Sequence, residues 1–154
     1  MSSAGPATGA GTVDAAAISF FIEHPDCVLF CRDGRRRPLG YPMRITSLDG
    51  GVIHFTTYAK SAKVAHVKAD PRILVISYRS DAEDAVTWAT ASGRASIWSP
   101  TQQDLGWIFS GNGDGRVPSG MSSHVSQRLL EGKRVMLSMP VDQAAVRSSR
   151  VVLP

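Results

Sequence analysis

Six side chains that can bind a phosphate group are concentrated in one short stretch near the middle of this sequence. They are Arg44, Thr46, Thr56, Thr57, Ser61 and Lys63. Arg44 and Thr46 are two positions apart on a predicted strand, so they point to the same side and lie about 6.6 Å apart. Guanidinium, ammonium and hydroxyl groups all donate hydrogen bonds to phosphate oxygens, and the two cations also attract the negative charge. The stretch therefore predicts a binding site for a phosphate or a similar anion.

The predicted helix that begins at Ser61 adds to this site. Lys63 falls in its first turn, where unpaired backbone N–H groups and the helix dipole favour a negative charge. Each residue also has an ordinary structural explanation, because Ser61 is a common helix cap and Lys63 a common surface residue. A second pattern is weaker. Gly115 and Gly120 have the spacing of a nucleotide-binding loop, but Met121 stands where that loop needs a lysine.

Apolar runs and turn-forming residues predict the elements that position these side chains. Asp-Gly pairs at 33–34 and 49–50 separate three apolar runs, which predicts an antiparallel meander of three strands over residues 27–57. A long strand over Ala85–Trp98, with Gly93 as its bend, suits a barrel wall that curves from one sheet into another. The other expected strands are Arg72–Ser80 and one or two closing strands over Lys133–Met139 and Ala144–Val152, and the expected helices are Ala15–His24, Ser61–Asp70, Pro100–Phe109 and Met121–Glu131.

These elements indicate one domain of the α+β class, mainly β, in which six or seven mostly antiparallel strands form a small barrel. Residues 1–13 carry no charge and are expected to be a disordered tail, so the domain is expected to cover residues 14–154. The tail lacks the basic start and the apolar stretch of a signal peptide, which favours a cytoplasmic protein. The Gly-rich loop over 110–120 has no recognisable signature.

The charge and the apolar runs of the chain limit the classes of binding partner that are expected. The 17 basic residues exceed the 13 acidic ones by four, and the densest basic patch comprises Arg32 and Arg35–Arg37. This patch is either a solvated hairpin tip or a surface that steers an anion. The aromatic residues are not interleaved with basic clusters, and no apolar run approaches the roughly 20 residues of a transmembrane helix. We therefore expect neither nucleic acid nor a membrane as a partner.

The cysteines and histidines predict no redox or metal chemistry. Cys27 and Cys31 lie four positions apart on a predicted strand, roughly 13 Å, which is too far for a disulfide. The four histidines are scattered and form none of the usual ligand spacings, so no metal site is expected.

An ordered set of short fragments runs through about half of the chain. The fragments are Phe30-Cys31-Arg32-Asp33-Gly34, Tyr41-Pro42-Met43-Arg44-Ile45, Phe55-Thr56-Thr57, Ser61-Ala62-Lys63, Asp70-Pro71-Arg72 and Ser92-Gly93-Arg94-Ala95. Their order and spacing resemble the pyridoxamine 5′-phosphate oxidase-like split β-barrel family of flavin and deazaflavin proteins. The resemblance implies an α+β, mainly β fold: a small antiparallel split β-barrel with a few short helices.

The same resemblance implies a site and an assembly. It implies a homodimer with the cofactor at the subunit interface, and it places Trp88 near the cofactor ring. It also implies that the residues around Arg44 and Lys63 hold the cofactor phosphate; the cofactor-binding set is Arg44, Thr46, Thr56, Thr57, Ser61, Lys63 and Trp88.

The C-terminal residues favour one branch of the family. The vitamin-forming oxidases carry an Arg-x-His motif near the C-terminus, whereas residues 149–154 contain no histidine, which disfavours vitamin B6 oxidation. The strand over 133–140 is instead similar to that of the deazaflavin-dependent branch, whose cofactor is F420. The expected cofactor is therefore F420 or FMN, with F420 slightly preferred.

The implied activity is that of an oxidoreductase, which transfers a hydride between bound F420 or FMN and a small conjugated or cyclic substrate. Hydride chemistry resides in the cofactor, so no side chain is selected as catalytic; Tyr41, Tyr58 or a substrate-side water are candidate proton donors. The alternative is a non-catalytic cofactor carrier or sensor with the same fold. Nucleic-acid binding by a small basic barrel is a third and less favoured hypothesis.

Overall fold

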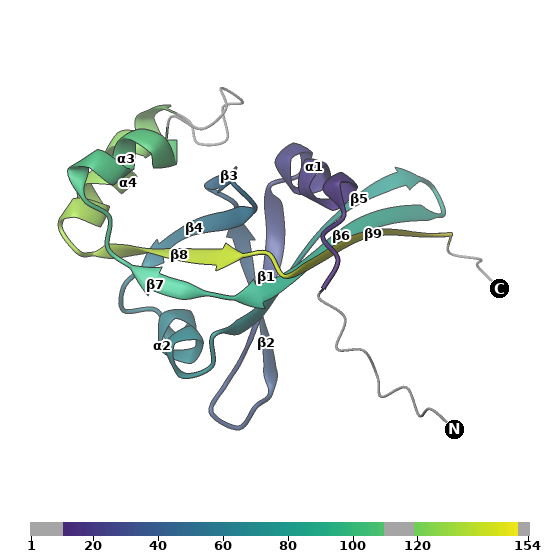
Figure 1. Cartoon of the computed structure of the whole chain (residues 1–154), viewed down its shortest axis with the longest axis horizontal. Helices are drawn as coiled ribbons and strands as arrows, with labels where there is room; N and C mark the ends of the chain where they lie inside the picture. Colours follow the sequence, from purple (N-terminus) through teal and green to yellow (C-terminus); the bar gives the residue numbers. More distant parts are fainter. Residues whose placement is uncertain (1–10, 110–118, 151–154) are drawn as a thin grey trace, which may run out of the picture.

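The computed structural model describes residues 11–109 and 119–150, which form two antiparallel sheets around a shared core (Figure 1). The larger sheet has the strand order β2-β1-β5-β6-β9 and the smaller sheet the order β3-β4-β8-β7. The strands are β1 (Asp26–Arg32), β2 (Pro38–Arg44), β3 (Ser47–Asp49), β4 (Val52–Tyr58), β5 (Arg72–Ala82), β6 (Ala85–Arg94), β7 (Ser96–Trp98), β8 (Arg134–Pro140) and β9 (Gln143–Arg150). The helices are α1 (Ala15–Glu23), α2 (Ala62–Ala69), α3 (Gln102–Phe109) and α4 (Ser119–Leu130).

The two sheets meet where the chain passes from β6 into β7. β6 pairs with β5 and β9 in the larger sheet, and β7 pairs with β8 in the smaller one. Gly93 stands just before this crossing, and a Cβ atom there would lie 2.2 Å from the carbonyl oxygen of Pro140. Only glycine allows so close an approach of two backbones. The predicted long strand that changes sheets at Gly93 is therefore confirmed.

The core is filled by large apolar side chains from both sheets and from α1. Phe21 of α1 and Phe55 of β4 are fully buried, together with Leu29, Ile53, Val75 and Leu137. Burying a side chain of this size stabilises the fold by about 1.5–3 kcal/mol. α1 begins where the Asp14 carboxylate accepts a hydrogen bond from the Ala16 N–H at 2.9 Å, as an aspartate at a helix N-cap commonly does.

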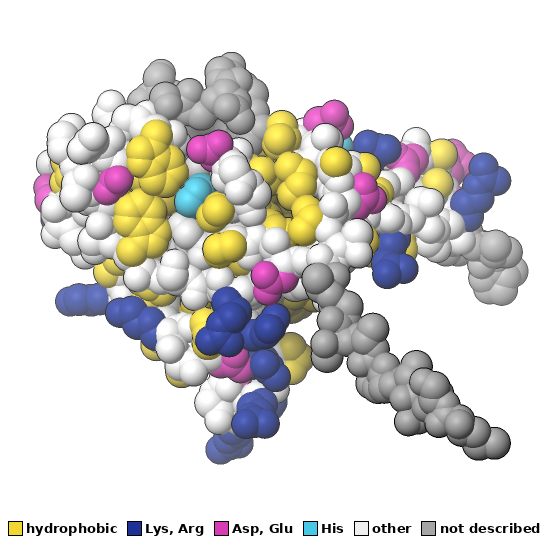
Figure 2. Space-filling model, in the orientation of Figure 1, with side chains coloured by type: hydrophobic (Ala, Val, Ile, Leu, Met, Phe, Trp, Pro, Cys, Tyr) yellow, Lys and Arg dark blue, Asp and Glu magenta, His cyan; other side chains and the backbone are white. Residues whose placement is uncertain are grey.

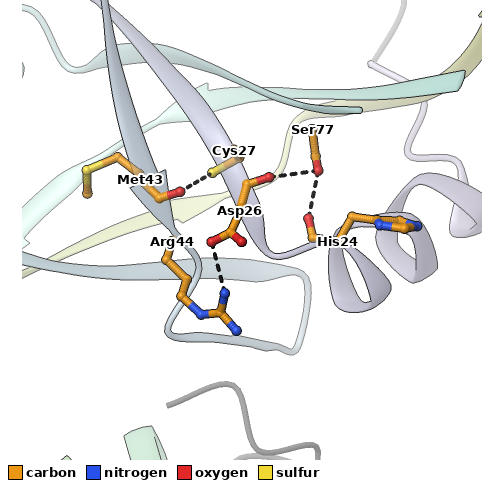
Figure 3. Close-up of polar contacts among 6 residues, drawn as sticks. All are labelled: His24, Asp26, Cys27, Met43, Arg44 and Ser77. Atoms are coloured by element: carbon orange, nitrogen blue, oxygen red, sulfur yellow. Dashed lines mark hydrogen bonds and ion pairs between the residues drawn. The ribbon is translucent and has the colours of Figure 1, made fainter. Parts of the chain in front are cut away.

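The cysteines behave as small core residues. Cys27 and Cys31 are both buried and free, so the expectation that they do not pair is confirmed. Burial raises the pKa of the Cys27 thiol to about 12, with a smaller contribution from the Asp26 charge. The Cys27 Sγ lies 3.6 Å from the Met43 carbonyl oxygen (Figure 3).

The predicted meander over residues 27–57 is wrong in one respect: it consists of two hairpins in different sheets. β1 and β2 pair in the larger sheet, and β3 and β4 pair in the smaller one. The second strand of the predicted meander, expected over Leu39–Ser47, ends at Arg44 in the structure, and the chain then crosses between the sheets through the fully buried Ile45. At the crossing, the Ile45 N–H donates to the Pro25 carbonyl oxygen at 2.9 Å. The backbone N–H groups of Ile45 and Thr46 bond to the carbonyl oxygens of Pro25 and His54, so they remain satisfied although β2 has ended. The side chains stay buried as well, and the pattern of apolar residues therefore does not show the break.

The predicted helices all form, with α4 beginning at Ser119 rather than Met121. The described strands number nine rather than six or seven, because β3 and β7 are three-residue strands that the patterning joined to longer runs. Most of the predicted Gly-rich loop over 110–120, and residues 1–10 of the predicted tail, lie outside the described residues. Val13 pairs with Ala144 of β9 in a parallel bridge. None of the helices in the described ranges has the length and apolarity needed to cross a membrane.

α3 and α4, which we call the helical arm, pack on the smaller sheet through a second apolar cluster of Leu105, Ile108, Leu129 and Met136. Trp98 of β7 stacks on Trp107 of α3, with ring centroids 6.0 Å apart. The Trp98 indole N–H donates to the Ser138 Oγ at 2.8 Å, and this Oγ lies 2.6 Å from the Nδ1 of buried His54. Because the indole can only donate, the Ser138 hydroxyl is free to donate to Nδ1 of a neutral His54. Burial lowers the pKa of His54, which favours this neutral form.

Candidate functional site

A cavity of about 260 Å³ lies at the end of β2, beside β4 and the first turn of α2. β8 contributes one wall, and the helical arm contributes another. Its described lining residues are Pro42, Met43, Arg44, Ile45, Thr46, Thr56, Thr57, Tyr58, Lys63, Phe109, Val125 and Arg134. We call this cavity the anion pocket. It combines three cationic side chains and three threonine hydroxyls with an apolar wall, and none of these lining residues is acidic.

Lys63 reaches the pocket from the first turn of α2. Its Nζ donates to the Thr57 Oγ1 at 2.9 Å and lies 5.5 Å from the centre of the Tyr41 ring. Burial lowers the pKa of Lys63, and the nearby positive charge of Arg134 lowers it further. No carboxylate of the described residues forms an ion pair with Lys63. A partly desolvated ammonium that faces another cation is stabilised when an anion binds between them.

Arg134 enters the pocket from the first position of β8. Its Nε donates to the Thr56 Oγ1 and its Nη2 donates to the Thr56 carbonyl oxygen, each at 3.0 Å. The guanidinium stacks on Tyr58 at 4.5 Å from the ring centre, and Arg128 of α4 donates to the Tyr58 Oη at 3.2 Å. These contacts fix the plane of the guanidinium while its remaining N–H groups stay available, which is the geometry that suits bidentate binding of a phosphate.

Arg44 closes the pocket at the end of β2. Its Nη1 forms an ion pair with the Asp26 carboxylate at 2.9 Å (Figure 3). The Asp26 carbonyl oxygen lies 3.0 Å from the Ser77 Oγ, which is also 2.7 Å from the His24 carbonyl oxygen. Ser77 is fully buried, so this contact ties the end of α1 to the start of β1. Arg44 thus pairs with the first residue of β1 and lines the same pocket as Thr46.

The structure brings together five of the seven residues predicted to bind a cofactor: Arg44, Thr46, Thr56, Thr57 and Lys63 all line the anion pocket. Ser61 caps the N-terminus of α2 but is not among the lining residues, and its buried Oγ has no hydrogen-bond partner. Trp88 lies on β6 away from the pocket, opposite Tyr78 and Arg147 on the neighbouring strands. The cofactor roles of all seven residues stay predictions.

Six lining residues were not selected from the sequence as site residues: Pro42, Met43, Ile45, Phe109, Val125 and Arg134. Arg134 is brought to the pocket by β-pairing, because it lies directly opposite Tyr58 in the β4–β8 register. The one sequence feature that could have indicated Arg134 is its basic side chain at the start of the strand predicted over Lys133–Met139. Phe109 and Val125 come from the helical arm, and nothing local in their sequence marks them as pocket residues.

The basic patch at the β1–β2 turn does not belong to this pocket within one chain. Arg37 and Arg44 are separated by seven strand positions, which corresponds to about 23 Å. The patch instead borders a separate depression lined by Arg32, Arg36 and Asp70, among others.

The pocket fits a phosphate group better than it fits a whole flavin. The three cations and the three threonine hydroxyls that line it are donors suited to phosphate oxygens. The volume of about 260 Å³ is below the ~300–1,000 Å³ of pockets that enclose a drug-sized ligand. A tricyclic ring would therefore extend beyond this pocket. The described residues contain no cluster of three or more metal-ligating side chains.

The two sheets, their crossing at Gly93 and the pocket at their edge define a split β-barrel of the pyridoxamine 5′-phosphate oxidase-like type, which confirms the fold expected from the resemblance. No family model and no curated protein matches the chain in sequence. Solved structures do match. A conserved hypothetical protein from Mycobacterium tuberculosis aligns with a TM-score of 0.66 and 21% identity over 95% of this chain and 92% of its own.

Two further structures share the fold. An FAD-binding protein from Mesorhizobium loti aligns with a TM-score of 0.63 and 13% identity over 89% of this chain and 96% of its own. An F420 reductase aligns with a TM-score of 0.52 and 17% identity over 82% of this chain and 94% of its own. At these identities, the comparisons establish the fold, and the neighbours include flavin-binding and F420-using proteins.

Proposed function

We propose that this protein is a flavin- or deazaflavin-dependent oxidoreductase of the cytoplasm that holds F420 or FMN by its phosphate in the anion pocket. The substrate would be a small conjugated or cyclic molecule. When bound, such a cofactor supplies the hydride chemistry, so the protein has to bind, orient and shield it. The proposal draws support from the neighbours named for FAD and F420, and it prefers F420 slightly over FMN.

The observation that carries the proposal is the pair of cations without acidic partners. Lys63 and Arg134 stand close enough for Arg134 to lower the pKa of Lys63. Their described hydrogen-bond partners are Thr57, Thr56 and Tyr58, and none of these is a carboxylate. Two like charges in a partly desolvated pocket are unfavourable until an anion joins them. A bound phosphate provides that anion.

The residues of the pocket have distinct tasks in this proposal. Lys63, Arg134 and Arg44 bind the phosphate oxygens, while Thr46, Thr56 and Thr57 donate or relay hydrogen bonds. Phe109 and Val125 of the helical arm exclude water from the opposite wall. Tyr58 is the better placed of the two candidate proton donors, because it lines the pocket and its Oη accepts from Arg128, which leaves its own hydrogen free.

We also propose that the protein is a homodimer, with the cofactor ring between the subunits. The ring must extend past a pocket of about 260 Å³, and a second copy can cover it. Trp88 would contact the ring only from the partner subunit, since it lies away from the pocket of its own chain.

Ligand titration tests the proposal. The purified protein is titrated with FMN, F420 and riboflavin while intrinsic tryptophan fluorescence is followed. FMN or F420 should bind far more tightly than 1 mM, and riboflavin, which lacks the phosphate, should bind at least tenfold more weakly than FMN (tenfold equals about 1.4 kcal/mol). Binding weaker than millimolar for both phosphorylated cofactors overturns the proposal. Equal affinity for riboflavin and FMN would show that the anion pocket does not bind the cofactor phosphate.

A non-catalytic carrier or sensor is the second candidate function. It is favoured by the absence of any carboxylate or imidazole among the described lining residues, since these are the usual proton donors. Turnover separates the two functions. An enzyme oxidises its reduced cofactor in the presence of enones, quinones or tetrapyrroles, whereas a carrier binds the cofactor with the same affinity and shows no acceleration over the free cofactor.

A further inference from the structure

The helical arm packs over a row of buried polar side chains on the smaller sheet. Ser47 of β3 lies opposite His54 of β4, which in turn lies opposite Ser138 of β8, so the three side chains share one face of the sheet. We call these three buried residues the polar row. Trp107 of α3 covers His54 in an edge-to-face contact, with ring centroids 5.1 Å apart. Figure 2 shows apolar side chains gathered around a histidine where the arm meets the smaller sheet, at the left of the view.

The hydrogen bonds of the polar row suit a neutral His54. The Trp98 indole N–H donates to the Ser138 Oγ at 2.8 Å, and this Oγ lies 2.6 Å from the His54 Nδ1. A proton on Nδ1 would make both neighbours of the Oγ donors and leave the Ser138 hydroxyl hydrogen without that acceptor. The Ser47 Oγ is buried and has no hydrogen-bond partner, so it does not bind the ring either. A charged His54 therefore loses hydrogen bonding here as well as hydration.

Few charges face His54, so little compensates for a buried positive ring. The exposed Asp49 carboxylate of β3 raises the pKa of His54, but burial lowers this pKa by more. Asp104 of α3 accepts a hydrogen bond from the Trp107 indole N–H at 3.3 Å, and no carboxylate of the described residues forms an ion pair with His54. The arginines of α4 and β8 contact Tyr58, on the pocket side: they are Arg128 and Arg134. The uncharged side chains on this face beside His54 are Ser47 of β3, Val52 and Thr56 of β4, Trp98 of β7 and Ser138 of β8.

Detachment of the arm would relieve this conflict. The apolar cluster of Leu105, Ile108, Leu129 and Met136 holds the arm on the smaller sheet, and without the arm the polar row meets water. In water an imidazole has a pKa near 6.5, whereas burial under the packed arm keeps the pKa of His54 below that value. The detached state therefore binds more protons, and packing becomes less favourable as the pH falls from 6.5 to the pKa of the packed state. A single proton limits this change to about tenfold per pH unit.

The helix that covers His54 also lines the anion pocket. Trp107 contacts His54, and Phe109, two positions further along α3, lines the pocket. Val125 of α4 lines the pocket as well, and both helices contribute to the cluster that holds the arm. Because α3 is a single helix of eight residues, Phe109 moves together with Trp107. Detachment at the polar row therefore removes the wall that the arm contributes to the pocket.

We infer that His54 is a proton-dependent switch: protonation of its imidazole detaches the helical arm from the smaller sheet and opens the anion pocket. The neutral imidazole keeps the arm packed and the pocket covered. This inference goes beyond the proposed function, because it concerns when the pocket is open rather than which anion it binds.

Hydrogen exchange of the backbone amides tests the switch without any ligand. The protection of α3, corrected for the intrinsic exchange rate, is measured from pH 8 to pH 5 and compared with that of β5 and β6. In the wild type, α3 protection should be level above pH 7 and fall several-fold between pH 6.5 and pH 5.5. At every pH, α3 should exchange at least about tenfold faster than β5 and β6, because the arm opens without the core. Protection of α3 that does not change with pH, or that equals the protection of the two strands, overturns the inference.

Single histidine substitutions show which residue is responsible. His54→Asn keeps an oxygen acceptor near the position of Nδ1 and cannot take up a proton in this pH range, so its α3 protection should not fall. His24→Gln, at the C-terminal end of α1, and His124→Gln, exposed on α4, each remove another titratable ring and should retain the wild-type fall. A fall that persists in His54→Asn, or that disappears in either control, overturns the inference.

The wild type alone gives a second test, which holds even if His54→Asn fails to fold. The fall in α3 protection should end at the pKa that an NMR titration measures for His54 in the folded protein, because below that pH both states carry the proton. A fall that ends at a different pH belongs to another group and overturns the inference.

FMN release tests the link between His54 and the anion pocket. On going from pH 7.5 to pH 5.5, the rate of FMN dissociation should rise several-fold more in the wild type than in His54→Asn. Comparing the two proteins cancels the titration of the FMN phosphate itself. An equal rise in both proteins overturns the inference. If FMN does not bind at pH 7.5, the proposed function fails instead, and hydrogen exchange still decides whether His54 controls the arm.

Discussion

Lys63→Met provides a direct test of the anion pocket. Methionine keeps the length and apolar bulk of the lysine stem beside Tyr41 and removes only the ammonium, which in the structure donates to Thr57 at 2.9 Å. A hydrogen bond to a charged group contributes about 1.5–3 kcal/mol. FMN or F420 should therefore bind about 10- to 150-fold more weakly to the variant.

The same substitution should leave the free protein as stable as the wild type, or more stable. In the free protein, burial and the charge of Arg134 both oppose a charged Lys63, as the lowered pKa of Lys63 records. Removing the ammonium relieves this repulsion. Calorimetric titration gives the affinity and thermal unfolding gives the Tm. Lys68→Met on the exposed side of the same helix is the matched control, for which affinity should not change.

The pH dependence adds a second readout. Because the pKa of Lys63 is lowered, cofactor affinity in the wild type should begin to fall at a lower pH than an ordinary lysine pKa of about 10.4 would dictate. Lys63→Met should lose that fall. A variant that binds FMN normally but unfolds at a lower temperature would refute the reasoning, since Lys63 would then be a structural residue rather than a ligand for phosphate.

Three further predictions concern the fold. Gly93→Ala should destabilise the protein by about 1–3 kcal/mol in urea unfolding, because the added Cβ meets the Pro140 carbonyl oxygen. Gly106→Ala, in the interior of α3 where nothing lies near the added Cβ, should stabilise it by up to about 1 kcal/mol. Equal effects of the two substitutions would contradict the close approach of the backbones at the crossing. Burial lowers the pKa of His54 below its unfolded value near 6.5, so the unfolded state binds more protons. The stability that His54 contributes above that pH should therefore be lost as the pH falls through the folded-state pKa. His54→Gln should flatten this pH dependence of stability, and an unchanged slope would mean that another group causes it. With its pKa raised to about 12, Cys27 should react with a thiol reagent only on unfolding, and rapid labelling of the native protein at pH 8 would show that this strand opens.

The sequence predicted the barrel because local signals agree with the global fold. Asp-Gly turns, the cap at Asp14 and the glycine at 93 each specify a local geometry that the final structure keeps. The break after Arg44 was missed for a physical reason. Ile45 and Thr46 remain buried while they cross between sheets, so they look like a continued strand in a pattern that records only apolarity.

The site was predictable where its residues are close in sequence. Arg44 and Thr46 are two positions apart and both line the pocket, although the chain leaves β2 between them. The short loop from β4 to α2 places Lys63 beside Thr57. Arg134 was missed because its hydrogen bond to Thr56 spans 78 positions, and the pairing of β4 with β8 decides it.

Trp88 illustrates the limit of strand alternation. Its neighbours at odd positions, such as Ala89 and Ala91, are small and buried because the larger sheet closely approaches α1 and β8. Alternation alone separates the two faces of a strand without saying which one meets the core. The small residues turn out to be inside, and the tryptophan faces outward.

The three tryptophans are fluorescent probes of two separate regions of the protein. Trp98 of β7 stacks on Trp107 of the helical arm, and Phe109 at the end of α3 lines the pocket. Trp88, in contrast, lies on the face of the larger sheet that points away from the core. Replacing Trp88 by Phe leaves emission that reports only on the arm, and replacing the stacked pair leaves emission that reports only on the sheet. Ligand entry and subunit association can therefore be timed separately in one stopped-flow cuvette, without attaching a dye.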